Sequence, residues 1–138
     1  MKRNTGSQPK RSGFSLVELV VVVLIMGILA AVAAPKLFDK MSDARESASR
    51  QSLAVIRGAI ELYLAEEGSY PATLATDLEN NLIKGAFPTA EVTTPATNTV
   101  VVVTSDPIKG TDVTAAGGWL YNATTGEVRI NDATAIAW

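Results

Sequence analysis

The chain has 138 residues and a net charge of −2 at neutral pH, and it contains neither cysteine nor histidine. These absences exclude a disulfide framework, a thiolate nucleophile and any metal site built on cysteine or histidine. They also remove the commonest general base. Carboxylates, serine, lysine or tyrosine could still serve a catalytic site, but no catalytic constellation of them is visible in the sequence. We therefore expect a protein that is not an enzyme and carries no cofactor.

The first segment, 1–13, is polar and basic. It contains Lys2, Arg3, Lys10 and Arg11 and no acidic residue. Its serine, glycine, asparagine and proline content predicts a disordered leader. The rest of the chain is net acidic, so no basic patch for nucleic acid is visible there. A basic start ahead of an apolar run indicates a single-pass membrane protein with a cytoplasmic N-terminus.

An apolar run at 14–34 follows, in which Ser15 and Glu18 are the only polar side chains. It is long enough to cross a bilayer as a helix. Pro35 is expected to kink this helix without ending it. Apolar residues at three- and four-residue steps predict an amphipathic continuation over 35–67, and Gly68 is a natural stop.

The remaining segment, 68–138, predicts a small β-rich head. Together with the helix it indicates an α+β fold, in which the long helix packs on a small antiparallel sheet. The elements expected in the head are a short helix near 75–83, a strand at 100–104, loops at 89–99 and 106–118, and a hairpin of 119–121 with 128–130 and Gly126 near its turn.

Three classes of protein share an N-terminal segment of this kind. A secretory signal peptide is one, and Ala31-Val32-Ala33 resembles its cleavage site. A plain transmembrane anchor is the second. A helix that assembles with other helices is the third, and Glu18 favours it. A charged side chain in an apolar segment costs about 2.5–3.5 kcal/mol on insertion scales, and an anchor or signal peptide gains nothing from that cost.

The residues Gly13-Phe14-Ser15-Leu16-Val17-Glu18-Leu19 resemble the start of the type IV pilins and of the pseudopilins of type II secretion systems. That family has a basic leader ending in glycine, then phenylalanine, then glutamate as the fifth residue of the mature chain, then an apolar stretch. Gly27 and Pro35 also fall where the family has glycine and proline. The close resemblance covers residues 11 to about 39, and the C-terminal half resembles the family in architecture.

The resemblance implies a mechanism. A prepilin peptidase would cut between Gly13 and Phe14 and methylate the new amine of Phe14. Glu18 would pair with that amine on a neighbouring subunit, and the stretch between Gly27 and Pro35 would kink or locally lose helix on assembly. The implied partners are further copies in a filament, other pilin-like subunits, an inner-membrane assembly platform and membrane lipid.

The favoured hypothesis is a pseudopilin of the bacterial inner membrane whose head faces the periplasm or cell exterior. The lack of cysteine favours a pseudopilin, because many true pilins carry a C-terminal disulfide loop. A type IV pilin for adhesion, motility or DNA uptake is the alternative, and a secreted enzyme or binding protein is the alternative of another class.

Major pseudopilins often bind calcium in a C-terminal loop, and calcium favours oxygen ligands, so Asp106, Asp112 and Asp132 are minor candidates. Trp138 is predicted either to cap the core or to meet a neighbour.

Overall fold

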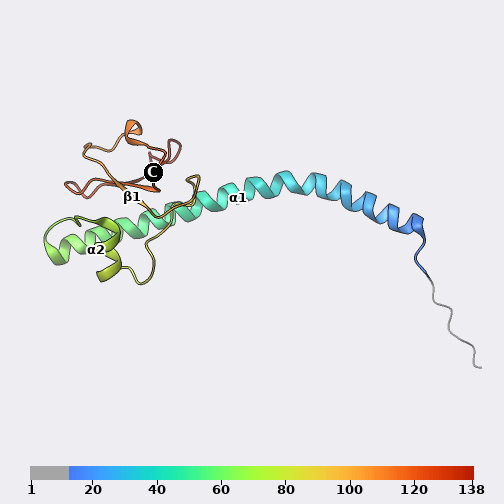
Figure 1. Cartoon of the computed structure of the whole chain (residues 1–138), viewed down its shortest axis with the longest axis horizontal. Helices are drawn as coiled ribbons and strands as arrows, with labels where there is room; N and C mark the ends of the chain where they lie inside the picture. The colour runs from blue at the N-terminus through green and yellow to red at the C-terminus, as the bar shows by residue number, and fades with distance from the viewer. Residues whose placement is uncertain (1–12) are drawn as a thin grey trace, which may run out of the picture. The chain divides into compact units, whose positions relative to one another are not determined.

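The structure, a computed structural model, describes residues 13–138 (Figure 1). The described residues form two compact units, one ending at Asp39 and the other running from Lys40 to Trp138. The predicted leader lies outside the described residues, apart from Gly13. The elements are α1 (Leu16–Glu67), α2 (Leu74–Asn81), β1 (Val100–Val102), the 3₁₀ helix η1 (Gly110–Asp112), β2 (Trp119–Tyr121) and β3 (Val128–Ile130).

Helix α1 confirms the long helix expected from the sequence, although it begins at Leu16 and not at Phe14. Pro35 lies inside α1, which therefore continues past it. Proline has no N–H, so the carbonyl of Ala31 loses its usual helical donor at this point. The helix ends just before Gly68, whose φ of 73° is the left-handed conformation that glycine adopts without strain.

The head sheet has three strands in the order β1-β2-β3. The β2–β3 hairpin is antiparallel, as predicted, with Trp119 opposite Ile130 and Tyr121 opposite Val128. Strand β1, however, runs parallel to β2, so the prediction of a wholly antiparallel sheet is wrong. Parallel neighbours need a long crossover, and the segment after β1, which includes η1, provides it. The sequence predicted only a loop there.

The core of the head joins one face of the sheet to helices α1 and α2. Trp119 and Tyr121 point to this face, and Leu120, between them, is buried outside the core cluster. This confirms the alternation expected of a strand. The buried apolar members are Leu53, Ile56 and Ile60 of α1, Leu74 and Leu78 of α2, Trp119 and Tyr121 of β2, Val128 and Ile130 of β3, and Phe87, Ala90 and Ala135.

Both aromatic side chains of β2 also satisfy their polar atoms. The indole nitrogen of Trp119 donates to the carbonyl of Pro88 at 2.9 Å, and the hydroxyl of Tyr121 donates to the carbonyl of Pro71 at 2.8 Å. Burial raises the pKa of Tyr121 to about 12. These bonds tie the loops around residues 71 and 88 to the sheet, and a buried aromatic residue gives the most apolar contact when its polar atom has a partner.

Three arginines hold the residue at position 138. Arg57 of α1 and Arg129 of β3 each donate a 2.8 Å hydrogen bond to the main-chain oxygen of Trp138. Arg50 lies over the indole ring, 4.2 Å from its centroid. Burial and the nearby Arg129 guanidinium lower the pKa of Arg57. We call this group the arginine clasp. It links α1 to β3, and the Trp138 side chain packs against the core cluster, in agreement with the first of its two predicted roles.

Candidate assembly site at the start of helix α1

The first turn of α1 is closed by a reciprocal pair of hydrogen bonds. The hydroxyl of Ser15 accepts from the backbone N–H of Val17 at 3.3 Å, and the carboxylate of Glu18 accepts from the backbone N–H of Ser15 at 3.0 Å. This is a variant of the capping box in which the Ser15 hydroxyl accepts from the second helical N–H and not the third. It satisfies N–H groups that a helix start leaves without partners. The signal was present in the sequence as Ser15-Leu16-Val17-Glu18, but the family resemblance drew attention to Glu18 alone.

Capping leaves the Glu18 carboxylate able to accept further hydrogen bonds. The cap engages Oε2, and a carboxylate can accept about four hydrogen bonds in total. Within residues 13–138 the structure gives Glu18 no cationic partner. The side chain is exposed and lies beside apolar neighbours such as Leu19 and Val22, which are 63% and 47% exposed. A charge in this setting favours a partner brought by another molecule.

Gly13 and Phe14 precede the helix and are both exposed. The side chain of Phe14 is 89% exposed, so the described chain offers it no packing site. The bond between these two residues lies two residues before the first residue of α1. A protease that binds extended backbone could therefore reach it without unwinding the helix.

Gly27 and Pro35 both lie in helical backbone. A Cβ atom added at Gly27 would meet nothing within 4 Å in the described chain. The fold of a single copy therefore gives no reason for glycine there, although glycine weakens a helix by about 1 kcal/mol relative to alanine. The predicted loss of helix on assembly concerns another state of the protein and stays a prediction.

Most of the first unit is an apolar helical surface without intramolecular cover. The side chains of Leu16, Leu24 and Met26 are all more than 60% exposed. Among the described residues, α1 is the one helix long and apolar enough to cross a membrane, and a signal sequence near an N-terminus would meet the same criterion. The surface needs lipid, other helices or both to cover it.

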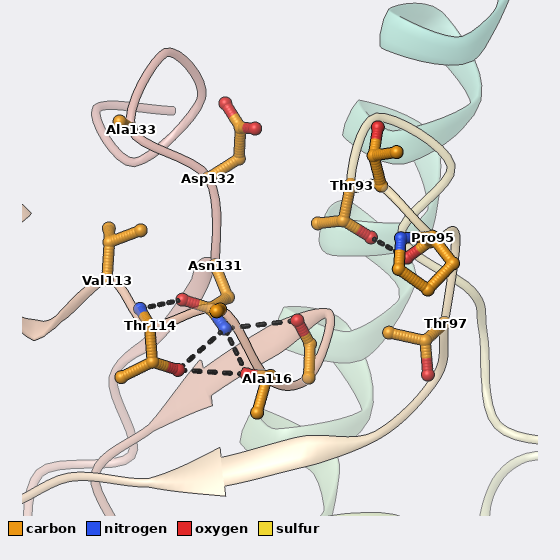
Figure 2. Close-up of a pocket in the computed structure, with 12 residues that line it drawn as sticks. Thr93, Pro95, Thr97, Val113, Thr114, Ala116, Asn131, Asp132 and Ala133 are labelled. Carbon is orange, nitrogen blue, oxygen red and sulfur yellow. Dashed lines mark hydrogen bonds between the residues drawn. The ribbon is translucent and has the colours of Figure 1, made fainter.

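The head has a separate pocket of about 420 Å³, lined by threonines, Asn131 and the segment 113–117 (Figure 2). Its polar groups are largely engaged with one another. Asn131 accepts from the N–H of Thr114 and donates to the carbonyl oxygens of Ala116 and Gly117. Across the pocket, Thr93 donates to carbonyls of its own loop. These bonds hold the loops in place and leave few groups to recognise a ligand.

Two of the three aspartates considered for calcium, Asp112 and Asp132, have local hydrogen-bond partners. Asp112 accepts from the Ser105 hydroxyl and from the backbone N–H of Lys109, and these hydrogen bonds hold the pKa of Asp112 below its usual range. Asp132 accepts from the N–H of Thr134 in a tight turn. Within residues 13–138, no group of three or more acidic side chains is placed to hold a metal ion.

Comparison with known proteins points to the same N-terminal segment as the candidate site. Residues 8–34 match a family model described as the prokaryotic N-terminal methylation motif. Type II secretion system core protein G of Pseudomonas aeruginosa is 34% identical over 64 residues, which are 46% of this chain and 45% of that protein. Fimbrial protein EcpC of Eikenella corrodens is 32% identical over 95 residues, which are 68% of this chain and 62% of that protein.

The chain belongs to the type IV pilin and pseudopilin family. A third relative, prepilin peptidase-dependent protein A of Clostridium perfringens, is 38% identical over 66 residues, 48% of this chain and 47% of its own length. The chain therefore spans about half the length of the first two relatives that it matches, the core protein G and this one. No solved structure matches it. The family motif lies in residues 8–34, which include Gly13 and Phe14 just before α1 and Glu18 in its first turn.

Proposed function

We propose that this protein is a structural, non-enzymatic subunit of a pilus-like filament, and specifically a pseudopilin of a type II secretion system. The observation that carries the proposal is the exposed apolar face of α1 before Lys40, in which Glu18 is the one acidic side chain between Phe14 and Ala34. Such a helix is suited first to lipid and then to a bundle of identical helices. The match to several core protein G sequences supports the secretion machine.

A type IV pilin is the second candidate. Fimbrial protein EcpC aligns with a larger share of this chain than core protein G does. The major pilin PilA of Myxococcus xanthus is also 34% identical, over 62 residues. Both candidates share the N-terminal helix and the assembly site, and they differ in the machine that drives assembly. Deleting the secretion ATPase or the pilus ATPase of the same cell would separate them.

Processing is the first step of the proposed function. A prepilin peptidase would cut between Gly13 and Phe14 and methylate the Phe14 amine. This removes Lys2, Arg3, Lys10 and Arg11 and leaves the apolar helix in the inner membrane. The basic segment would hold the N-terminus in the cytoplasm and direct the head to the other side. The assembly platform would then draw the subunit out of the bilayer.

In the filament, the free amine of Phe14 would meet the Glu18 carboxylate of a neighbouring subunit. The attraction is stronger among packed helices than in water, because the effective dielectric constant is lower there. Glu18 can keep its bond to the Ser15 N–H while it accepts from this amine. The pair would therefore fix the position of one subunit against the next, because a misplaced copy leaves a buried charge unpaired.

Intact-mass measurement of the membrane-purified protein tests the processing step. The expected mature chain starts at Phe14 and carries one extra methyl group. A bulky substitution at Gly13 should leave the leader attached. A mature chain that starts at Ala34 would identify a secretory signal peptide and refute the filament proposal.

Glu18→Ala tests the assembly step. The variant should be processed normally, because the Gly13–Phe14 bond is unchanged, and it should insert into the membrane at least as well. Sheared filaments, or secretion, should fall sharply. Glu46→Ala is the control, because Glu46 belongs to an exposed ion pair with Arg50 on the same helix. Normal filaments from a fully processed Glu18→Ala subunit would show that the carboxylate does not direct assembly.

A further inference from the structure

Helix α1 carries a second apolar line within the unit that starts at Lys40. Met41, Ala48, Val55 and Leu62 recur at seven-residue steps, so they share one face of the helix. Met41, Val55 and Leu62 are 52%, 50% and 49% exposed. The head core uses a different face, through residues such as Ile56 and Ile60. The head therefore leaves Met41, Val55 and Leu62 about half exposed, whereas Ala48 is partly buried.

The positions between these residues are suited to a close helix neighbour. In the same seven-residue frame, the companion seam positions hold Ala44, Gln51, Gly58 and Ala65, three of them small. A Cβ added at Gly58 would meet nothing within 4 Å in the described chain. Apolar residues at one seam position and small residues at the other are typical of helices that pack closely side by side. We call the line 41–62, with these positions, the outer seam.

Charges on the two flanks of the outer seam limit how a second copy can lie on it. One flank carries Lys40 and, three seven-residue steps later, Glu61; the other carries Arg45 and, at the same interval, Glu66. All four side chains are exposed. In parallel coiled coils, a residue on one flank faces a residue of the partner five positions further on, on the opposite flank.

In a parallel pair without displacement, these rules bring like charges together. Lys40 would face Arg45 of the partner, and Glu61 would face Glu66. A displacement of three seven-residue steps, about 31 Å along the helix, reverses the outcome. Glu61 then faces Arg45 of the other copy, Glu66 faces Lys40, and Leu62 packs level with Met41. Opposite charges at these positions set register and partner choice.

We propose that the outer seam binds the same helix of a second copy, parallel and displaced by three seven-residue steps, so that Leu62 of one subunit packs beside Met41 of another. The proposal rests on the filament function above and names the surface through which the part of α1 after Lys40 touches a neighbouring subunit. In this register Met41, Ala48 and Val55 of one copy lie level with residues 20, 27 and 34 of the other. The acidic residues Glu61 and Glu66 beside the end of this line disfavour an anionic lipid surface, which attracts basic flanks. Parallel orientation follows from a chain in which every copy enters the membrane the same way.

Existing contacts do not block the proposed pairs. Lys40 forms a 3.3 Å ion pair with Asp43, but both side chains are more than two-thirds exposed, and such pairs contribute little. Among the described residues, Arg45, Glu61 and Glu66 make no ion pair within the chain. Subunit contact could therefore recruit all four charges at small cost.

The absence of native cysteine allows a direct test by cross-linking in intact membranes and sheared filaments. A Met41→Cys, Leu62→Cys double variant should form a ladder of disulfide-linked multimers after mild oxidation. The two single variants should form dimers only when they are co-expressed. Glu46→Cys with Glu67→Cys is the matched control. That pair has the same spacing on the opposite face of the helix and should give no ladder.

The outcomes separate this proposal from the filament function. Filaments that assemble, depend on Glu18 and show no cross-link between positions 41 and 62 would overturn the seam and leave the filament function standing. A homodimer of Val55→Cys in filaments would also overturn the displacement, because displaced parallel copies keep Val55 apart from its counterpart. A mature chain that starts at Ala34 and forms no filaments would instead refute the filament function itself.

Charge reversal gives a second readout. Glu61→Lys with Glu66→Lys should reduce sheared filaments about tenfold, which corresponds to about 1.4 kcal/mol. Adding Lys40→Glu and Arg45→Glu to the same chain should restore assembly, because each facing pair again has opposite signs. A variant that only damaged the fold would not be rescued in this way, so failure of the rescue with a folded head would count against the proposal.

Discussion

The residues before Lys40 and the head use the same kinds of side chain in opposite ways. Between Phe14 and Val32 the large apolar side chains are at least 46% exposed, the least being Val21. In the head, Leu53 and Trp119 are 2% and 0% exposed. The head buries its apolar surface within one chain, so its stability belongs to the single copy. The first region leaves its surface uncovered, so its stable state depends on lipid or on other copies.

This difference predicts two separate classes of mutational effect. A substitution in the head should change the free energy of unfolding, whereas one in the first region should change insertion or assembly. Both tryptophans, Trp119 and Trp138, lie in the head, so their fluorescence reports head unfolding alone. Denaturation in detergent micelles followed by this signal can test whether the two classes are distinct.

The largest expected effect on the head comes from Ile56→Ala. Ile56 is fully buried against the sheet, and its truncation should lower the free energy of unfolding by about 2–5 kcal/mol. Ile28→Ala is the matched variant in the first region, where Ile28 is 59% exposed. It should leave head unfolding within about 0.5 kcal/mol of the unmodified protein. Equal losses from both substitutions would show that the two regions unfold together.

Glycine substitution sharpens the same comparison. Gly126 has a φ of 74°, and a Cβ there would collide with the ring of Tyr70. Gly126→Ala should therefore destabilise the head by about 1–3 kcal/mol. Gly27→Ala meets no such obstacle and should leave the tryptophan transition unchanged while altering filament yield. A Gly27→Ala chain whose head unfolds more easily would contradict the separation between the region before Lys40 and the head.

The next effect is smaller and depends on pH. Tyr121→Phe removes the hydrogen bond to Pro71 and should cost about 0.5–1.5 kcal/mol near neutral pH. The raised pKa of about 12 means that the folded head favours the neutral phenol. Its contribution is fully present below the unfolded pKa of about 10 and is lost as the pH rises from about 10 to 12. Unfolding curves measured across that range should fall less steeply for Tyr121→Phe, and identical slopes would contradict this account.

The smallest effect concerns the capping box. Ser15→Ala should weaken the first turn of α1 by about 1 kcal/mol or less, without changing the head. Hydrogen exchange should accelerate at the amides just after position 15, and tryptophan fluorescence should not respond. Ser47→Ala, at an exposed site within the same helix, serves as the control. Unchanged exchange in the first turn would show that the cap is not formed in solution.

Local patterns predicted most of the elements of this fold. Apolar spacing and Gly68 gave the extent of α1 to within two residues at its start, and alternation around Leu120 gave the hairpin strands with the observed bounds. The parallel pairing of β1 was missed, because the alternation that marks a strand does not state its direction. Nor could any local pattern reveal the arginine clasp, because Arg57 and Trp138 are far apart in sequence.

A short, specific motif was enough to pick out the residues of the candidate site. The hydrogen bonds among them were not predicted from the sequence. The resemblance pointed to Gly13, Phe14 and Glu18, and the family match supports the motif. The Ser15–Glu18 cap could have been predicted from the spacing of those two residues alone. The partner that Glu18 is proposed to meet belongs to another molecule, so neither the sequence nor the structure of one copy contains it.

The arginine clasp makes the closure of the head independent of redox conditions. Its bonds join guanidinium groups to a main-chain oxygen and an indole ring, and none of these groups changes with the supply of oxidant. A disulfide in the same place would form only in an oxidising compartment. The clasp can therefore form in an oxidising or a reducing compartment alike.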